Sequence, residues 1–220
     1  MRKYRSLISS FSHLICISLS ILLLFSCLHH AWCTVVKKAS LASLVKQAQI
    51  IAHVRVGESW SPKTRGKQGE IYTYTRLTPL VTWLGEVTSD ELLLVQLGGQ
   101  IGELRLKVHG DAQLKSGDEV VLFLSTKRQQ LPVASDLDLK SVQIVNLVSL
   151  AQGTFFVQGK PDELGDLRRL NQNLDGLVFY TSSQKKLTLK PKPHQSSPKQ
   201  LWTLRTLKQE IERLKKGQTQ

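Results

Sequence analysis

The clearest hydrophobic pattern in the chain lies in the stretch Glu91–Val108. Its first half, Leu92–Leu97, is apolar at almost every position, which is typical of a strand that is buried on both faces. Its second half alternates apolar and charged residues, and these are Glu103, Leu104, Arg105, Leu106, Lys107 and Val108. Gly98 and Gly99 separate the halves and tolerate the positive φ angles of a tight turn. The pattern predicts a β-hairpin with its turn at these glycines and its first strand near the centre of a sheet.

Further strand patterns lie on both sides of this stretch. The predicted strands are Ile50–Val56, Ile71–Leu84, Glu119–Leu124, Val142–Val148, Thr154–Val157 and Leu177–Tyr180. Pro79 lies inside the second of them, and because proline cannot donate a ladder hydrogen bond, it predicts an edge position or a β-bulge. Six to eight sequential, mostly antiparallel strands are typical of a small barrel or sandwich, so we expect a mainly β fold.

Apolar residues at helical spacing occur in three segments. Ser40–Ala48 predicts a short leading helix with Ser40 as its N-cap. Leucine spacing predicts a second short helix over Leu164–Leu174. An amphipathic helix is predicted at the C-terminus, within residues 201–216, and its apolar stripe consists of Leu204, Leu207, Ile211 and Leu214.

The C-terminal helix needs a partner for its stripe, because an isolated helix of about 14 residues is only marginally stable in water. The stripe could dock on the body of the protein or pair with a partner helix. It could also lie on anionic lipid, with Lys208, Arg213, Lys215 and Lys216 near the headgroups. The sequence leaves these three alternatives open.

Residues 1–33 have the features of an export signal. The apolar run Leu14–Leu28 is shorter than the roughly 20 residues of a comfortable transmembrane helix. It follows a basic segment with Arg2, Lys3 and Arg5. We expect this signal to be removed, with an uncleaved N-terminal anchor as the alternative.

Two cleavage positions fit this segment. Leu24-Phe25-Ser26-Cys27 is similar to a bacterial lipobox, in which Cys27 would become the lipidated first residue. A conventional signal peptidase would instead cut near Ala31–Thr34. The mature protein is therefore expected in the periplasm or outside the cell, and on a membrane if Cys27 is lipidated.

All three cysteines, Cys16, Cys27 and Cys33, lie at or before this boundary. An exported body without cysteine cannot form disulfides, so its apolar core must stabilise it alone, which favours a bacterial envelope protein over a small animal secreted domain. The same absence excludes cysteine nucleophiles and thiolate metal ligands from the body.

The net charge of +13 is unevenly distributed. Residues 34–183 carry 17 basic and 15 acidic residues, whereas residues 184–220 carry ten basic and two acidic residues. A nearly neutral body argues against a nucleic-acid partner, and the basic excess belongs to the tail. We predict a signal at 1–33, a β-barrel domain at 34–158, an extension of that domain at 159–183, a Pro/Lys-rich linker at 184–200 and the helix at 201–216.

Three segments carry a resemblance to a known family. Ser40–Val56 is a helix that leads into a strand, Tyr74–Gly85 is a long strand that closes on Trp83-Leu84-Gly85, and Gly117–Leu124 is a glycine followed by an apolar strand. Over roughly residues 40–157 the chain resembles the netrin-like and tissue-inhibitor-of-metalloproteinase modules. The same arrangement recurs in exported bacterial proteins of unknown role, which the chain resembles more.

The resemblance implies a five-stranded OB-like barrel. It does not carry over the inhibitory activity, which in those inhibitors depends on a mature N-terminal cysteine locked by a disulfide. Cys33 could provide such an N-terminus only if cleavage fell after Trp32, and the body has no second cysteine.

The sequence shows little catalytic or ligand-binding chemistry. The histidines after the signal, His53, His109 and His194, have no ligand spacing, so we expect no metal site. The glycines around Gly98 precede a strand rather than a helix, so they do not predict a nucleotide loop. Acidic residues in polar segments are interpreted as solvated turns: Asp136, Asp138, Asp162, Glu163 and Asp166. No catalytic residue, cofactor or small-molecule substrate is predicted.

Aromatic residues are the other candidates for contact with a partner. Tyr72 and Tyr74 lie on one strand face, and Trp60 lies in what reads as an exposed polar loop. Such residues can stack on bases in OB barrels, but cross-strand packing is the simpler role for the tyrosines. Trp60 is the best candidate for an exposed contact residue.

These observations favour an exported, non-catalytic bacterial envelope protein that binds a protein or a membrane surface through its loops and basic tail. A protease-inhibitor-like module is the alternative, and an enzyme of unrecognised type is the third hypothesis. A pocket that holds His53 or His109 beside carboxylates would favour the enzyme. The sequence does not indicate an oligomeric state.

Overall fold

The computed structural model describes residues 34–62, 69–126, 142–160, 165–180 and 201–217, all within one compact unit, Cys33–Gln220. The predicted signal, Cys27 and the predicted linker lie outside the described residues. The elements are β1 (Thr34–Lys37), α2 (Leu41–Gln47), β2 (Ile50–Trp60), β3 (Tyr72–Leu84), β4 (Leu92–Leu97), β5 (Gly99–Ile101), β6 (Leu104–Leu106), β7 (Glu119–Ser125), β8 (Gln143–Leu147), the 3₁₀ helix η1 (Leu150–Gly153), β9 (Thr154–Val157), the 3₁₀ helix η2 (Gly165–Leu167), β10 (Leu170–Asn171), β11 (Leu177–Tyr180) and α4 (Leu204–Lys216). None of the described helices has the length and apolar character needed to cross a lipid bilayer.

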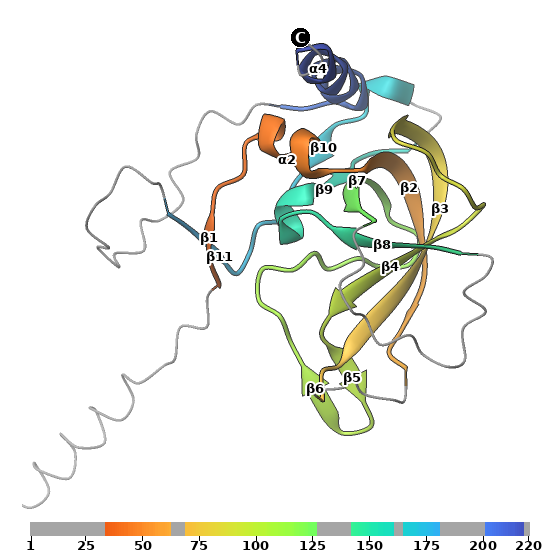
Figure 1. Cartoon of the computed structure of the whole chain (residues 1–220), viewed down its shortest axis with the longest axis vertical. Helices are drawn as coiled ribbons and strands as arrows, with labels where there is room; N and C mark the ends of the chain where they lie inside the picture. The colour runs from red at the N-terminus through yellow and green to blue at the C-terminus, as the bar shows by residue number, and fades with distance from the viewer. Residues whose placement is uncertain (1–33, 63–68, 127–141, 161–164, 181–200, 218–220) are drawn as a thin grey trace, which may run out of the picture. The chain divides into compact units, whose positions relative to one another are not determined.

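Five strands close into a barrel (Figure 1). β2 pairs antiparallel with β3 and β7, and β3 pairs antiparallel with β4. β8 closes the ring, because it pairs parallel with β4 and antiparallel with β7. β9 and β10 extend the sheet beyond β7, and β1 pairs with β11 in a separate sheet. The prediction of a mainly β fold with a small barrel, a leading helix and a C-terminal helix is confirmed, and the barrel is consistent with an OB-like fold.

The barrel interior is filled by alternate residues of its strands. None of the residues in this set is more than 1% exposed: Ile50, Ala52, Val54, Val56, Leu77, Leu92, Leu94, Val120, Leu122, Leu124 and Val145. Because side chains alternate across a strand, the residues between them point outward. His53, Arg55 and Glu119 therefore lie on the outer surface of β2 and β7.

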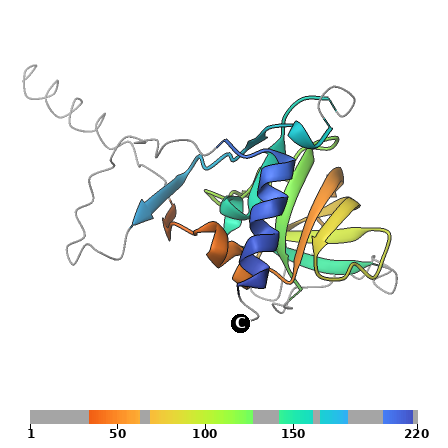
Figure 2. The same cartoon turned by 90° about the horizontal axis from the view of Figure 1, so that it is seen from above.

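α2 and α4 cover part of this outer surface (Figure 2). The outward residues Ile51, Val121 and Phe123 belong to the same hydrophobic cluster as Leu207 and Ile211 of α4, which are completely buried. α2 and α4 also contact each other. Of the three alternatives for the C-terminal stripe, the structure shows docking on the body.

Both helices begin at capped residues. Ser40 Oγ accepts a hydrogen bond from Ser43 N (3.1 Å), so the predicted N-cap of the leading helix is confirmed. Thr203 and Thr206 form a reciprocal capping box at the start of α4. Such caps satisfy backbone N–H groups that have no partner within a helix, so each helix start is locally encoded.

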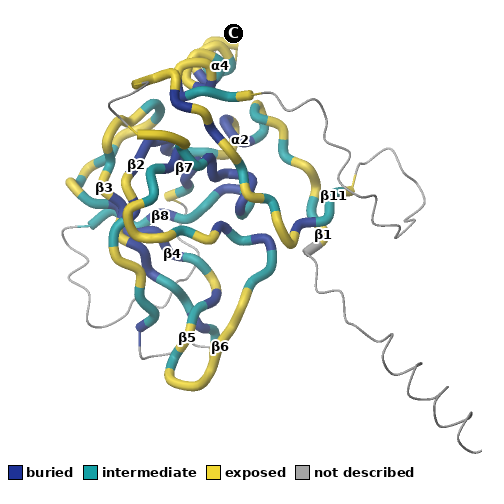
Figure 3. Tube along the Cα trace, turned by 180° about the vertical axis from the view of Figure 1, so that it is seen from behind, coloured by how far each residue is buried: buried dark blue, intermediate teal, exposed yellow. Residues whose placement is uncertain are grey.

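The predicted hairpin turn at Gly98 and Gly99 is wrong. β4 ends just before these glycines as predicted, but β6 pairs with β5 and the chain reverses at Gly102. Gly98 and Gly99 have φ angles of 109° and 136° and redirect the chain into this small sheet. Leu104 and Leu106 are 51% and 38% exposed, so their alternation does not mark a dry face, and Figure 3 shows this hairpin mostly exposed.

The predicted helix over Leu164–Leu174 is also wrong. Its described part contains η2 and β10 instead. Leu170 N donates to Trp202 O (2.8 Å), and β10 pairs with β9. These tertiary hydrogen bonds replace the local bonds that a helix would need, which the leucine spacing could not reveal.

Pro79 produces the β-bulge that its position predicts. Val54 pairs with Pro79 and His53 pairs with Val81, so Leu80 is an extra residue on β3. β3 pairs with β4 only over residues 72–77, so Pro79 also lies where β3 has one sheet neighbour. The bulge places Val81 beside His53.

Gly85→Ala is expected to lower the free energy of unfolding by about 1 to 3 kcal/mol more than Gly69→Ala. The φ angles are +79° at Gly85 and +85° at Gly69, so alanine is strained at both positions. Only at Gly85 would the new Cβ meet backbone, because the carbonyl of Gln49 lies against it, whereas nothing lies within 4 Å at Gly69. Urea unfolding of both variants measures the difference. An equal loss of unfolding free energy in the two variants would contradict the close approach of the Gln49 carbonyl to Gly85.

Candidate functional site

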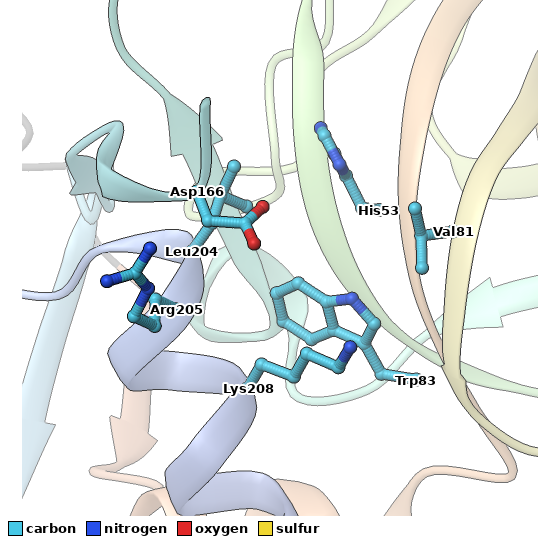
Figure 4. A pocket seen from close by; sticks show the side chains of 7 residues that line it. All are labelled: His53, Val81, Trp83, Asp166, Leu204, Arg205 and Lys208. Atoms are coloured by element: carbon cyan, nitrogen blue, oxygen red, sulfur yellow. The ribbon is translucent and has the colours of Figure 1, made fainter. Parts of the chain in front are cut away.

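A small pocket lies where α4 and η2 meet the outer surface of the barrel (Figure 4). Its volume is about 180 Å³, and its lining residues are His53, Val81, Trp83, Asp166, Leu204, Arg205 and Lys208. β2 and β3 supply the first three, η2 supplies Asp166, and α4 supplies the rest. The pocket exists only because segments more than a hundred residues apart in sequence come together.

His53 reaches this pocket because of strand alternation. Its neighbours Ala52 and Val54 are completely buried in the barrel interior, so His53 points out of the barrel. It is nevertheless only 6% exposed, because elements outside the barrel cover it. A histidine on an outer strand face has thus become a buried polar group.

Glu119 anchors a buried ion network behind His53. Its Oε1 accepts a hydrogen bond from Arg55 Nη2 (2.7 Å), and its Oε2 accepts one from Arg168 Nη1 (2.6 Å). His53 Nε2 lies 3.3 Å from Glu119 Oε2, but it makes no hydrogen bond of good geometry. The side chains of Glu119 and Arg168 are 12% and 9% exposed, whereas that of Arg55 is 54% exposed, so the Glu119–Arg168 pair is shielded from water and the Arg55 end of the network is open to it.

Arg168 connects this network to the segments around it. Its Nε donates to Gly165 O (3.1 Å) in η2, and its carbonyl accepts from Leu204 N (3.1 Å) at the start of α4. Through its side chain and its backbone carbonyl, this one residue therefore joins the barrel, η2 and α4. The pocket wall is held by hydrogen bonds as well as by apolar packing.

The network determines the charge state of its members. Burial acts to raise the pKa of Glu119, but hydrogen bonds from Arg55 and Arg168 outweigh it and lower this pKa from 4.5 to about 2. Burial lowers the pKa of His53 below 6.5; the nearby arginines add to this effect, and Glu119 opposes it. At pH 7 Glu119 is a carboxylate and His53 is neutral.

The open side of the pocket carries charges of both signs. Asp166, Arg205 and Lys208 line it, and among the ion pairs of the described residues none joins Asp166 to either cation. In Figure 4 the carboxylate of Asp166 points into the space between His53 and Trp83, and Lys208 extends toward Trp83. The pocket therefore combines an apolar wall, a neutral imidazole and charges of opposite sign.

The described residues contain no cluster of three or more histidine, cysteine, aspartate or glutamate side chains that could hold a metal ion. His109 is half-buried and lies away from His53 in the chain, at the end of the segment after β6.

The predicted aromatic contact residues lie together on a different outer surface, that of β3 and β4. Trp60 stacks on Tyr74 with ring centroids 6.0 Å apart, and Arg76 lies 5.5 Å above the Trp60 ring. Tyr74 is 2% exposed, and Tyr72 is half-buried in the same cluster. Trp60 is not in a loop: it ends β2 and is half-buried. The tyrosines have the cross-strand packing role that the sequence offered as the simpler one.

The predicted basic contact residues of the C-terminal helix lie on α4. Lys208, Arg213 and Lys216 are exposed, and Lys215 is half-buried. Arg213 makes two hydrogen bonds to Glu210, at 2.6 and 2.7 Å. Lys208 alone among these four also lines the pocket. Cys27, the predicted lipidation site, lies outside the described residues.

Sequence reasoning missed Glu119 and Arg168 and interpreted Asp166 as a solvated turn residue. It named His53 as a residue that would favour an enzyme if it lay in a pocket beside carboxylates. One sequence signal of this site was present, because the alternation in β2 places His53 and Arg55 together on the outer face of the barrel. The helix that covers this face was also predicted, but which face it would cover was not. The comparisons do not add to this: no protein-family model, curated protein or solved structure matches the chain.

Proposed function

We propose that the protein is an exported, non-catalytic binding module whose partner is an anionic surface, such as the headgroup layer of a membrane. The observation that carries the proposal is the orientation of α4. Its apolar stripe is buried against the barrel, and four of its five basic residues are exposed: Arg205, Lys208, Arg213 and Lys216. A helix docked in this way can present its charges to a membrane surface without inserting into the bilayer.

The charges of α4 support this partner. The helix contains five basic and two acidic residues, and Glu210, one of the acidic residues, is already bonded to Arg213. Lys46, in the last turn of α2, is exposed on the neighbouring helix. Basic residues near an anionic lipid surface each contribute about 1 kcal/mol of attraction.

The likeness to netrin-like modules and to tissue inhibitors of metalloproteinases is part of this proposal at the level of the fold. The closed five-strand barrel supports it. An inhibitory activity is less well supported, because it would require Cys33 as a free mature N-terminus and residues 34–220 contain no cysteine to lock it.

Catalysis is the second candidate function, since His53 does lie in a pocket beside Glu119 and Asp166. His53 is neutral at pH 7 and could accept a proton. The seven lining residues include no serine, threonine or cysteine, so the nucleophile would have to be Asp166, Lys208, His53, a water molecule or a group of the substrate. Binding needs no activated nucleophile and is the simpler function.

The mature protein is expected to sediment with anionic phosphatidylglycerol vesicles, and not with neutral phosphatidylcholine vesicles, at about 0.05 M salt. Raising the salt to about 0.5 M should release it. The triple variant R205Q/K208Q/K216Q should bind roughly a hundredfold more weakly, because three of the outward charges of α4 are lost.

The matched control is R105Q/K107Q/K115Q, which removes three exposed basic residues from elsewhere on the body. It changes the net charge equally but leaves α4 intact, so it should bind nearly as well as the wild type. Equal losses in the two triple variants, or no sedimentation of the wild type, would refute a surface specific to α4.

The export part of the proposal is tested by the intact mass and N-terminal sequence of the protein from its native envelope. A diacylglyceryl increment on Cys27 would tie it to a membrane, and an unmodified start near Thr34 would make it a free exported protein. Retention of residues 1–33 would refute cleavage.

A further inference from the structure

We infer that the pocket between α4 and the barrel binds a small zwitterion, namely a free α-amino acid with an apolar side chain. This site shares Arg205 and Lys208 with the outward basic surface of α4, but binding of the small ligand does not depend on lipid. Three features of the pocket carry the inference: its charges, its buried and fixed histidine, and its apolar wall.

The charges of the lining match a ligand that carries both signs. Asp166 directs its carboxylate into the pocket, and Lys208 borders the same space (Figure 4). No ion pair joins Asp166 to Lys208 or to Arg205 among the described residues, so the three side chains do not neutralise one another directly. An α-ammonium group beside Asp166 and an α-carboxylate beside Lys208 would match both signs with charge-assisted hydrogen bonds.

His53 forms the buried side of the pocket. It is 6% exposed, and its Nε2 is shielded from solvent and lies 3.3 Å from Glu119 Oε2 without a hydrogen bond of good geometry. Glu119 and Arg168 hold the wall behind it, so the imidazole is fixed in place before a ligand arrives.

The size and apolar wall of the pocket define the rest of the ligand. Val81, Trp83 and Leu204 form the apolar part of the lining. A cavity of about 150 Å³ is known to hold a benzene molecule, whereas pockets for drug-sized ligands begin near 300 Å³. A volume of about 180 Å³ therefore fits one small amino acid and is below the size of pockets for drug-sized ligands.

The test uses three probes that share one branched apolar group. Leucine carries both charges, 4-methylpentanoate lacks the ammonium group, and 3-methylbutylamine lacks the carboxylate. Isothermal titration of the mature protein, without vesicles, should show millimolar or tighter binding of leucine and at least tenfold weaker binding of the other two. No heat with leucine, or equal binding of 4-methylpentanoate or 3-methylbutylamine, would overturn the assignment.

Two variants locate the binding. Asp166→Asn and Lys208→Gln change exposed side chains, so both proteins should fold, and each should weaken leucine binding about tenfold. Asp166→Asn should leave 4-methylpentanoate binding unchanged, and Lys208→Gln should leave 3-methylbutylamine binding unchanged. The controls Asp90→Asn and Lys216→Gln remove exposed charges outside the pocket and should not affect leucine. Equal losses in the controls would show that the binding does not use this pocket.

Discussion

Leu207→Ala should lower the free energy of unfolding by about 2 to 5 kcal/mol, the usual cost of removing a leucine side chain from a packed core. Leu207 is completely buried between α4 and the outer surface of the barrel. Little of this loss can be recovered by relaxation, because the side chain packs against strands that the barrel already holds in place. A domain is stable by only about 5 to 15 kcal/mol, so the loss is a large fraction of the total.

Leu201→Ala provides the matched control for this variant. Leu201 precedes the same helix but is 66% exposed, so the identical chemical change should cost less than about 0.5 kcal/mol. Urea unfolding of both variants, followed by circular dichroism, gives the comparison. If the two variants lost the same stability, α4 would not be docked in solution, and the pocket that it helps to form would not exist there.

Glu119→Gln is expected to destabilise the protein by about 3 kcal/mol, because it removes the charge that compensates a buried guanidinium. Arg168 is 9% exposed and would keep its charge, so it would lose its charged partner without gaining access to water. The variant keeps the shape of the side chain, and the effect is therefore electrostatic rather than one of packing.

The pair Arg76–Glu91 offers a matched control. It has the same short distance as the Arg168–Glu119 pair, 2.6 Å, but its side chains are 45% and 40% exposed. Exposed ion pairs contribute only about 0 to 1 kcal/mol, so Glu91→Gln should be nearly neutral. A similar loss in both variants would mean that burial does not strengthen the Glu119 network.

The effect of Glu119→Gln should depend on pH. The pKa of Glu119 is lowered from 4.5 to about 2 in the folded protein, so its stabilising effect is complete above pH 4.5 and is lost as the pH falls toward 2. The stability difference between the wild type and Glu119→Gln should therefore narrow over this range. His53 contributes in the same direction at higher pH, because its lowered pKa makes its protonation unfavourable to folding below about 6.5. Urea unfolding at pH values from 7 to 2.5 measures the difference, and a constant difference would contradict the shifted pKa.

Local patterns predicted most of the individual elements. Thr154–Val157 was predicted with the bounds of β9, and Ser40 caps α2 as expected. Pro79 marks a bulge for a reason that lies in its own covalent structure. These features depend on strand alternation, helix caps and backbone restrictions, which act over a few residues and can be recognised in one sequence.

The predictions failed where the local sequence pattern implied a packing partner other than the one that the folded chain provides. Leu104 and Leu106 alternate with charged residues as a half-buried strand would, yet both are exposed in the part of the chain that the structure describes. Residues 165–174 have helical leucine spacing, but Arg168 turns toward Glu119 and Leu170 bonds to Trp202. The first pattern lacks the distant packing partner that it implies, and the second is overruled by distant partners that it does not reveal.

The amino-acid sequence was sufficient to predict a mainly β body, its leading and C-terminal helices and the separation of a basic tail from a nearly neutral core. Hydrophobic periodicity and charge distribution are properties of the sequence alone, so these predictions needed no knowledge of which segments pack together. Only the tertiary structure determined which face α4 covers and that His53, Glu119, Arg168 and Asp166 would meet beneath it. These four residues come from three separate segments, β2, β7 and the segment of η2. Neither the lowered pKa of Glu119 nor the shape of the pocket exists until the folded chain brings these segments together and excludes water from between them.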